Sequence, residues 1–517
     1  MSNAFFHAMK PNYYLSTAIP YANAAPHIGY ALEALYADAM ARYQRLLGHE
    51  VFFLIGTDEH GQKMWRTAQE AGRPVGEYAA EKSALFQELA DEYNITNDDF
   101  IRTTEARHMK GVQAFWAACL ENGDIYKKQY VGLYCVGCEG FKTEKDLVEG
   151  KCPDHNRVPE EISEENYFFR LSKYQEPLQF LFDKNKEFVV PESRFNEMKN
   201  LLKNGLEDVS ISRSVEKLTW GIPVPGDESQ VMYVWFDALT NYITALGYGS
   251  GNEEKFKKFW PGTHVVGKEI NRFHSLLWPA MLMSAQLDVP KQIAVHGWIT
   301  VDGQKMSKSV GNVINPLELV QEFPLEAVRY FLLREIPFDN DGDYTRQKFM
   351  DRYVGDLANG IGNLTNRILT MVEKYCDGKI PDVDTVDQAT IDELTKKVWP
   401  SYSAHMRAWR FDLALDSANR FVTYCDQMIS DRAPWALAKA GQMREVHDLL
   451  HHLSEALRHA AVMFYPMIPE TAEKIMVQLG LDPAVELGKS LEDLQQWVEL
   501  TVGNEIKKGE QLFPRLI

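Results

Sequence analysis

The chain has 517 residues, of which 45% are hydrophobic, 25% are charged and 12% are aromatic. This length predicts about three domains, and this composition excludes a wholly disordered chain and a fibrous repeat. The formal net charge of -18 argues against a general nucleic-acid binder, because phosphate binding needs positive charge, although a local basic patch can still bind RNA.

The first predicted elements indicate a doubly wound, parallel α/β sheet of the Rossmann type. Residues 12–19 are apolar and rich in β-formers, which is typical of a buried strand. Apolar residues then recur at helical spacing over 32–46, and Gly48 is a stop signal. A second strand is predicted at 51–55. Because strand, helix and strand in this order indicate a parallel sheet, we assign 11–125 to the first half of the sheet domain.

The middle of the chain changes character and then returns to the α/β pattern. Residues 126–225 hold three cysteines and an acidic stretch, and they predict an inserted module with little regular structure at its tip. Residues 226–300 are assigned to the second half of the α/β domain. Strands are expected there at 232–236, 264–267 and 292–295.

The last two segments predict a loop-rich connector over 301–350 and a helical bundle over 351–517, where amphipathic periods dominate. No membrane partner is expected, because the most apolar stretch, 276–287, is too short for a span. The N-terminus lacks the apolar core of a signal peptide. Six cysteines do not make the disulfide framework of a small secreted protein, so we expect the chain in the reducing cytoplasm.

The first motif, Pro26-His27-Ile28-Gly29-Tyr30, lies where the first strand passes into the first helix. Ligands bind at this place in an open parallel sheet, and a helix N-terminus offers N–H groups to a phosphate. His27 and Tyr30 can donate hydrogen bonds to a phosphate, and Gly29 lets a base or ribose approach the backbone. The simpler alternative is a helix start with a capping histidine, and this segment alone favours it.

The second motif is Lys305-Met306-Ser307-Lys308-Ser309. Two lysines in a small, polar segment suit a mobile loop that closes over a polyphosphate and stabilises the charge of a leaving pyrophosphate. For a pair of lysines at this spacing, a solvated surface loop is the simpler alternative.

The third motif is Cys135-x2-Cys138 followed by Cys152-x2-His155, which is the spacing of two metal-binding knuckles. Tetrahedral Zn²⁺ coordination by these four side chains leaves no open position, so the predicted zinc is structural. A disulfide and a vestigial site are the alternatives.

In this order on an α/β sheet, the first two motifs resemble those of the class I aminoacyl-tRNA synthetases. Tyr30 stands where that family usually has a second histidine. Further segments resemble methionyl-tRNA synthetases in particular, and the resemblance runs from about residue 12 into the helical end of the chain. These segments are Thr17-Ala18-Ile19-Pro20-Tyr21-Ala22-Asn23, Thr57-Asp58-Glu59-His60-Gly61, Tyr233-Val234-Trp235-Phe236-Asp237-Ala238, Val266-Gly267-Lys268-Glu269 and Phe273-His274-Ser275-Leu276-Leu277-Trp278-Pro279.

The resemblance implies an enzyme that joins methionine and ATP into methionyl-adenylate, releases pyrophosphate and then charges the 3′-terminal ribose of tRNA(Met). It implies that Asp58 pairs with the methionine ammonium and that the thioether packs among soft, aromatic side chains. The remaining residues of the implied methionine pocket are Ile19, Tyr21, Trp235, Ala238, Tyr242, His274 and Trp278. Without the resemblance, ordinary helix packing would be the better interpretation of Phe273, His274 and Trp278.

The resemblance also implies where ATP binds. His27 and Tyr30 would contact the phosphates, with Gly29 beside the nucleotide, Glu269 would contact the adenosine, and Lys305 with Lys308 would stabilise the transition state. Mg²⁺ would accompany ATP.

Three residues of the helical end are implied to read the CAU anticodon, namely Asn363, Arg367 and Trp435. Unstacked bases stack on aromatic rings and are read along their edges by Asn and Arg. Taken alone, Pro434-Trp435 indicates only a helix start with a packed indole. No further domain of the kind that lets some relatives dimerise is expected after the bundle, so a monomer is expected.

Two alternative functions stay open. One is a catalytically inactive tRNA-binding relative, which Tyr30 favours, although the complete lysine motif and the pocket residues argue against it. The other is another small-pocket class I synthetase, such as the cysteine enzyme. That enzyme needs a metal thiolate in its pocket, whereas the paired cysteines here lie in the insertion.

Overall fold

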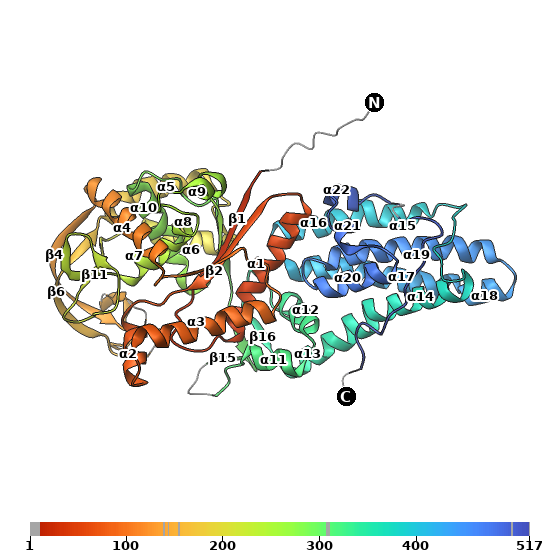
Figure 1. The fold of residues 1–517 in the computed structure, drawn as a ribbon, viewed down its shortest axis with the longest axis horizontal. Helices are drawn as coiled ribbons and strands as arrows, with labels where there is room; N and C mark the ends of the chain where they lie inside the picture. Colours follow the sequence, from red (N-terminus) through yellow and green to blue (C-terminus); the bar gives the residue numbers. More distant parts are fainter. Residues whose placement is uncertain are drawn as a thin grey trace, which may run out of the picture. The chain divides into compact units, whose positions relative to one another are not determined.

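The computed structural model describes residues 11–137, 140–142, 144–153, 156–306, 311–497 and 500–515. The chain divides into two compact units. The first, called here the α/β unit, comprises 12–34 and 52–296, and the second, the helical unit, comprises residue 11, 35–51 and 297–517. The first long helix, α1 (Ile28–Leu46), contributes to both units (Figure 1).

A six-stranded sheet in the order β3-β2-β1-β12-β13-β7 forms the centre of the α/β unit. The pairs β2–β3, β1–β12, β12–β13 and β13–β7 run parallel, which confirms the predicted parallel α/β class. From β1 the chain adds β2 and β3 on one side of the sheet, whereas β12 and β13 lie on the other side. In open α/β sheets, ligands bind at such a switch point, beyond the carboxyl ends of the strands. The strands are β1 (Tyr13–Thr17), β2 (Val51–Thr57), β3 (Asp99–Arg102), β7 (Val189–Val190), β12 (Thr263–Gly267) and β13 (Gln292–His296).

Helices with apolar faces cover this sheet and share one large core with it. The core includes strand residues such as Leu54 and Val266 and helix residues such as Phe115, Phe236 and Trp278. The helices of the α/β unit are α2 (Gln62–Glu70), α3 (Val75–Glu92), α4 (Ala106–Glu121), α5 (Gln175–Lys184), α6 (Glu192–Lys203), α7 (Val234–Leu239), α8 (Asn241–Thr244), α9 (Glu254–Phe259) and α10 (Trp278–Ser284).

The segment predicted as an irregular insertion contains well-formed sheet. Its long hairpin pairs β4 (Ile125–Cys135) with β6 (Glu160–Phe169), and β5 (Gly140–Lys142) and β8 (Val209–Ser210) extend it. A smaller sheet has the order β10 (Pro223–Val224), β11 (Asp227–Met232), β9 (Ser212–Ser214). Within the same segment, β7 joins the central sheet by pairing with β13, so the chain returns to the α/β core earlier than expected.

The strand predicted at 232–236 is wrong. Strand β11 ends at Met232, Tyr233 is the extended residue before the helix, and α7 begins at Val234. A short apolar run bounded by polar residues has no periodicity that separates a buried strand from a buried helix, which explains the error.

The helical unit begins with a connector that is more regular than expected. A small sheet has the order β15 (Gln304–Lys305), β14 (Ile299–Val301), β16 (Gly342–Tyr344). Asp302 and Gly303 both have positive φ, 51° and 72°, and they form the tight turn between β14 and β15. Three helices complete the connector, namely α11 (Pro316–Glu322), α12 (Leu325–Glu335) and α13 (Arg346–Arg352).

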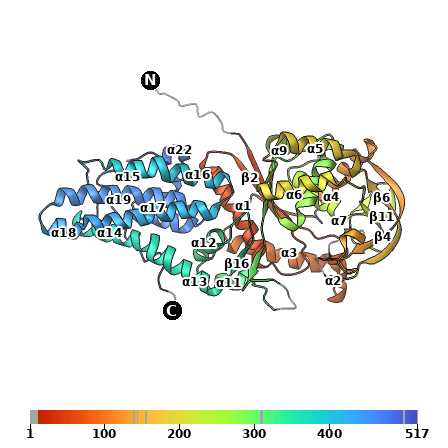
Figure 2. The same ribbon diagram turned by 180° about the vertical axis from the view of Figure 1, so that it is seen from behind.

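The predicted helical end of the chain is confirmed, and Figure 2 shows its long helices lying side by side. The bundle is formed by η5 (Tyr353–Gly362), α14 (Asn363–Tyr375), α15 (Gln388–Glu393), η6 (Leu394–Val398), α16 (Trp399–Arg407), α17 (Phe411–Arg432), α18 (Pro434–Lys439), α19 (Met443–Phe464), α20 (Pro469–Gln478), α21 (Pro483–Glu486) and α22 (Leu491–Leu494).

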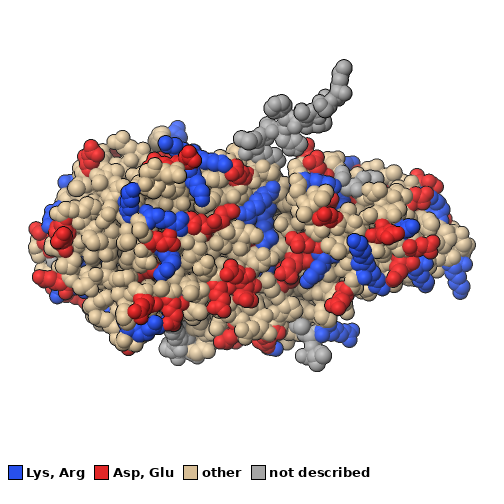
Figure 3. All heavy atoms as spheres, in the orientation of Figure 1, with Lys and Arg blue, Asp and Glu red and all other residues tan. Residues whose placement is uncertain are grey.

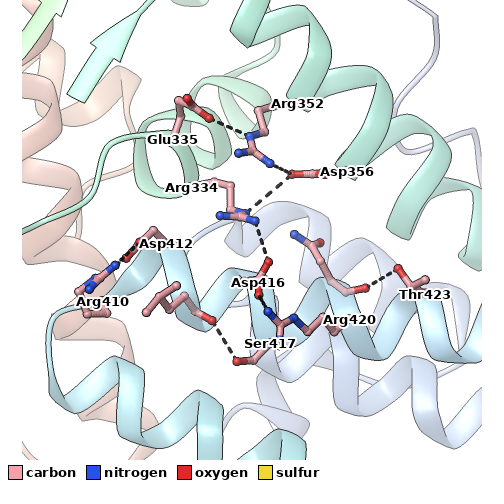
Figure 4. A network of polar contacts seen from close by, with 12 residues as sticks. Arg334, Glu335, Arg352, Asp356, Arg410, Asp412, Asp416, Ser417, Arg420 and Thr423 are labelled. Carbon is pink, nitrogen blue, oxygen red and sulfur yellow. Dashed lines mark hydrogen bonds and ion pairs between the residues drawn. The ribbon is translucent and has the colours of Figure 1, made fainter.

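Ion pairs link the connector to the bundle within this unit (Figure 4). Arg334 on α12 reaches Asp416 on α17 at 2.8 Å, and Arg352 reaches Glu335 at 2.9 Å and Asp356 at 3.2 Å. On the molecular face drawn in Figure 3, acidic and basic side chains are interspersed. Among the described helices, none has the length and apolarity that crossing a membrane requires.

Candidate active site

The carboxyl ends of β1 and β2 bring the first predicted pocket residues together. The N–H of Asp58 donates to the carbonyl of Pro20, and the N–H of Ala22 donates to the carbonyl of Asp58, both at 2.9 Å. This pairing places Asp58 beside the segment that carries Ile19 and Tyr21. Asp58 is only 3% exposed. Its Oδ1 accepts from the N–H of His60 at 3.3 Å, and a buried carboxylate suits the ammonium group of an amino acid.

Aromatic rings from α7 and from η4 (Phe273–Leu277), a single π-helical turn, form a stack. The rings of Trp235 and Phe273 are parallel within 3°, with centroids 3.9 Å apart, and His274 meets Trp235 edge-on at 6.2 Å. Ala238 is buried one helical turn after Trp235. The stack is flat, polarizable and only partly exposed, as a thioether site should be.

Tyr242 and His274 share a buried hydrogen bond of 2.7 Å. The Nδ1 of His274 lies 3.0 Å from the carbonyl of Ile270, which can only accept, so Nδ1 carries the proton. Burial lowers the pKa of His274 to about 4, which keeps the ring neutral and leaves Nε2 to accept from the Tyr242 hydroxyl. The orientation of Tyr242 is therefore fixed.

A second histidine, which the sequence did not reveal, supports this pair. His264 on β12 stacks on Tyr242 with centroids 4.0 Å apart, and Trp278 donates to its Nε2 at 3.3 Å. Nδ1 of His264 therefore carries the proton and donates to Ser16 Oγ at 2.7 Å. Ser16 and His264 are directly paired between the parallel strands β1 and β12. Burial lowers the pKa of His264 well below its usual value, so the ring is neutral. All eight predicted methionine-pocket residues lie in the α/β unit.

The first motif forms the N-terminus of α1. The N–H of Gly29 donates to Nδ1 of His27 at 3.1 Å, which is the capping role considered for this exposed histidine. In this tautomer, Nε2 is the protonated nitrogen and can donate to a phosphate. Tyr30 is buried with its ring edge-on to Phe86 at 4.9 Å, and its hydroxyl has no hydrogen-bond partner among the described residues. Its predicted phosphate contact remains a prediction.

A buried carboxylate one turn further along α1 was missed by sequence analysis. Glu33 Oε2 lies 3.0 Å from Nε2 of His296 at the end of β13. Burial raises the pKa of Glu33, the contact with His296 partly offsets this, and the nearby charge of Glu269 adds to the rise. Glu269 itself is exposed after β12. Only the position of Glu33 after the first motif could have indicated it, because its partner is 263 residues away.

The lysine motif belongs to the helical unit, and Ser307–Val310, including Lys308, lies outside the described residues. Lys305 ends the β14–β15 hairpin with its ammonium 4.2 Å from the centroid of the Trp298 ring. Asp343 Oδ1 anchors the hairpin by accepting from Gly303 N–H at 2.8 Å and from Thr300 Oγ1 at 2.7 Å.

The cysteine motif is described only in part, because Cys138 and His155 lie outside the described residues. Cys135 at the end of β4 and Cys152 are both buried and in no disulfide. The N–H of Cys152 donates to the carbonyl of Arg157, and the carbonyl of Cys152 accepts from the N–H of Asn156, both at 2.8 Å. No group of three or more metal-ligating side chains occurs within the described part of the chain.

The three predicted anticodon residues lie in the helical unit. Asn363 and Arg367 are on α14, and Arg367 pairs with Asp426 on α17. Trp435 on the short α18 is 50% exposed. The ring is therefore half packed and half accessible, and its predicted role as a stacking platform remains a prediction.

The family model "tRNA synthetases class I (M)" matches residues 13–161 and 155–369. The chain is 44% identical over 519 residues to the methionine–tRNA ligase of Caldanaerobacter subterraneus subsp. tengcongensis, covering 98% of this chain and 79% of that protein. The methionine–tRNA ligase of Thermotoga maritima is 43% identical over 511 residues, covering 98% and 80%. The structure of Mycobacterium tuberculosis methionyl-tRNA synthetase in complex with methionyl-adenylate matches with a TM-score of 0.93 and 39% identity, covering 98% of this chain and 100% of that one.

Proposed function

The chain belongs to the methionyl-type class I tRNA synthetases, and from this premise we propose that it activates methionine with ATP and transfers it to tRNA(Met). The observation that carries this function is the pocket itself. A buried carboxylate, Asp58, directly follows β2, and the other proposed pocket residues include the ring of Trp235, which stacks on Phe273, and the neutral His274. These are the groups that an ammonium and a thioether require.

In the first step, a carboxylate oxygen of methionine attacks the α-phosphorus of ATP. A bond forms between this oxygen and phosphorus, the bond to the β-phosphate oxygen breaks, and pyrophosphate leaves. The protein supplies no nucleophile, so catalysis consists of positioning and charge stabilisation. We assign His27 and Tyr30 to the phosphates and Glu269 to the adenosine, with Lys305 and Lys308 stabilising the charge that develops on pyrophosphate. Mg²⁺, if it accompanies ATP, would add to that stabilisation.

In the second step, the ribose hydroxyl at the end of tRNA attacks the carbonyl carbon of the adenylate, and AMP leaves. Asn363, Arg367 and Trp435 are proposed to select the tRNA by its anticodon. We expect the chain to act as a monomer in the cytoplasm, where tRNA is charged.

The function is tested by amino-acid-dependent exchange of pyrophosphate into ATP. We expect exchange with methionine and none with cysteine, leucine, isoleucine or valine. Exchange with cysteine instead would favour the other small-pocket synthetase. No exchange with any amino acid, in protein that still binds tRNA, would favour the inactive tRNA-binding relative. Tyr30→His would then be the first variant to test for exchange, because the family usually has a histidine at this position.

A structural zinc ion is proposed for Cys135, Cys138, Cys152 and His155. The burial of Cys135 and Cys152 and the backbone hydrogen bond from the N–H of Cys152 to the carbonyl of Arg157 support it. Zinc bound by four protein ligands stabilises its module without taking part in the reaction. We expect purified protein to contain about one zinc per chain and to lose stability with a strong chelator. Metal analysis that finds well under one zinc per chain would contradict the site.

Replacing the exposed indole tests the anticodon proposal. Stacking of a base on an aromatic ring contributes about 1–3 kcal/mol, so Trp435→Ala should lower kcat/KM for charging of tRNA(Met) about 5- to 150-fold. Pyrophosphate exchange needs no tRNA and should not change. Trp435→Phe keeps a ring and should retain most of the charging activity. Equal charging by the wild type and Trp435→Ala would mean that this indole is ordinary surface.

A further inference from the structure

Three buried side chains near the pocket form a cluster that the proposed reaction does not use. Both carboxylate oxygens of Asp237 are engaged. Oδ2 accepts from Nδ1 of His60 and Oδ1 accepts from Nε2 of His108, each at 2.7 Å. All three residues are at most 4% exposed. Burial alone would raise the pKa of Asp237, but the two histidines outweigh it and hold the pKa below its usual value, so the carboxylate stays ionised.

This cluster connects two walls of the methionine pocket. Asp237 lies on α7, two residues after Trp235 and directly before Ala238. His60 lies in the loop after β2, and its backbone N–H donates to Oδ1 of Asp58 at 3.3 Å. The Asp237 carboxylate therefore links the loop that carries Asp58 to the helix that carries Trp235.

The His108 end of the cluster is held in place by close packing. Nδ1 of His108 on α4 lies 2.8 Å from Thr244 Oγ1 on α8. A Cβ at Gly111, one turn after His108, would lie 2.3 Å from the Thr244 side chain, so these two helices approach as closely as glycine allows. At the His60 end, the Trp220 ring meets the His60 ring edge-on, with centroids 5.4 Å apart, and the Trp220 indole N–H donates to the carbonyl of Glu59 at 2.6 Å.

We propose that Asp237 is a positioning residue that, through His60 and His108, sets the separation of Asp58 from Trp235 and thereby the affinity for methionine. This inference rests on the proposed function, because it concerns that same pocket. The contacts of the cluster described above run to the loop that carries Asp58 and to the helix that carries Trp235, both of which belong to the methionine side of the proposed site. Loss of the cluster should therefore change methionine binding and not ATP binding.

The experiment compares variants that remove a donor with variants that keep it. His60→Ala removes the donor at Nδ1, whereas His60→Asn places an amide N–H near the same position. His108→Ala and His108→Gln form the matching pair for Nε2. Asp237→Asn keeps the shape but turns an amide N–H toward one of two histidine N–H groups. His451→Ala, which removes a fully buried histidine from α19 of the helical unit, controls for the general cost of such a cavity.

The readouts are KM for methionine and for ATP in pyrophosphate exchange, direct methionine binding by calorimetry, and the melting temperature. We expect His60→Ala, His108→Ala and Asp237→Asn to raise KM and Kd for methionine about 10- to 100-fold, with KM for ATP within about twofold of the wild type. His60→Asn and His108→Gln should recover most of the affinity. His451→Ala should lower only the melting temperature.

Two results would overturn the inference. One is a methionine affinity within about twofold of the wild type in all three disrupting variants. The other is an equal loss for methionine and ATP that follows the melting temperature and is not rescued by Asn or Gln. Both leave the proposed function intact, since the wild type would still exchange with methionine. A wild type without methionine-dependent exchange or binding would instead overturn the proposed function, and this inference with it.

Discussion

Asp58→Asn should raise KM for methionine by about two orders of magnitude, because the substrate ammonium would enter a buried site that no longer holds its counter-charge. Removing one partner of a buried, hydrogen-bonded charge pair costs about 2–5 kcal/mol. Asp58 is 3% exposed, so water cannot replace the lost charge. KM for ATP should change little. Steady-state pyrophosphate exchange at varied methionine and fixed ATP measures the effect.

Asp124→Asn is the matched control for this variant. Asp124 is also a fully buried carboxylate of the α/β unit, and it accepts from Lys173 at 2.7 Å and from Ser284 at 2.9 Å. Its loss should lower the melting temperature and leave KM for methionine unchanged. If Asp58→Asn shifted KM for methionine by less than threefold, or if both variants shifted it equally, Asp58 would not be the ammonium partner.

Arg458→Met should destabilise the helical unit by about 3–5 kcal/mol, the cost of removing one partner from a buried ion-pair network. Arg458 on α19 has a fully buried side chain that reaches Glu455 at 2.7 Å and Glu486 at 2.9 Å. It also donates to the carbonyls of Leu494 at 3.2 Å and Gln496 at 2.8 Å, so it holds the end of α22 and the residues that follow it against α19. Urea unfolding followed by far-ultraviolet circular dichroism measures the loss.

Arg444→Met on the same helix provides the comparison. Arg444 also pairs with several carboxylates, among them Asp382 at 3.0 Å and Asp448 at 3.0 Å, but its side chain is 38% exposed. Exposed ion pairs contribute about 0–1 kcal/mol, so this variant should unfold almost as the wild type does. Similar urea midpoints for the two variants would show that the buried network does not stabilise the unit.

The sequence predicts what is local in this structure. The strand at Tyr13–Thr17 and the helix at Ile28–Leu46 follow from their periodicity, and the first motif lies where the strand passes into the helix. β7 could not be predicted, because a two-residue strand carries no period of its own and exists only by pairing with β13.

The site shows the same division between local and distant information. Asp58, Trp235 and His274 are predicted because each lies in a contiguous segment that resembles methionyl-tRNA synthetases. The supporting contact between Ser16 and His264 joins residues 248 positions apart, and that between His60 and Asp237 joins residues 177 apart. A single sequence has no signal for such pairs, because only the closure of the sheet and the packing of its helices bring them together.

The π-helical turn at Phe273–Leu277 makes the pocket sensitive to the length of its own chain. The N–H of Trp278 donates to the carbonyl of Phe273, so this turn holds one residue more than an α-helical turn does. Deleting one residue between His274 and Trp278 would let the turn relax to α-helical bonding, and the wide turn that holds Phe273 and His274 against Trp235 would be lost. A change in the number of residues here would therefore alter the aromatic side of the pocket even though the helix on either side of the turn stays nearly in register.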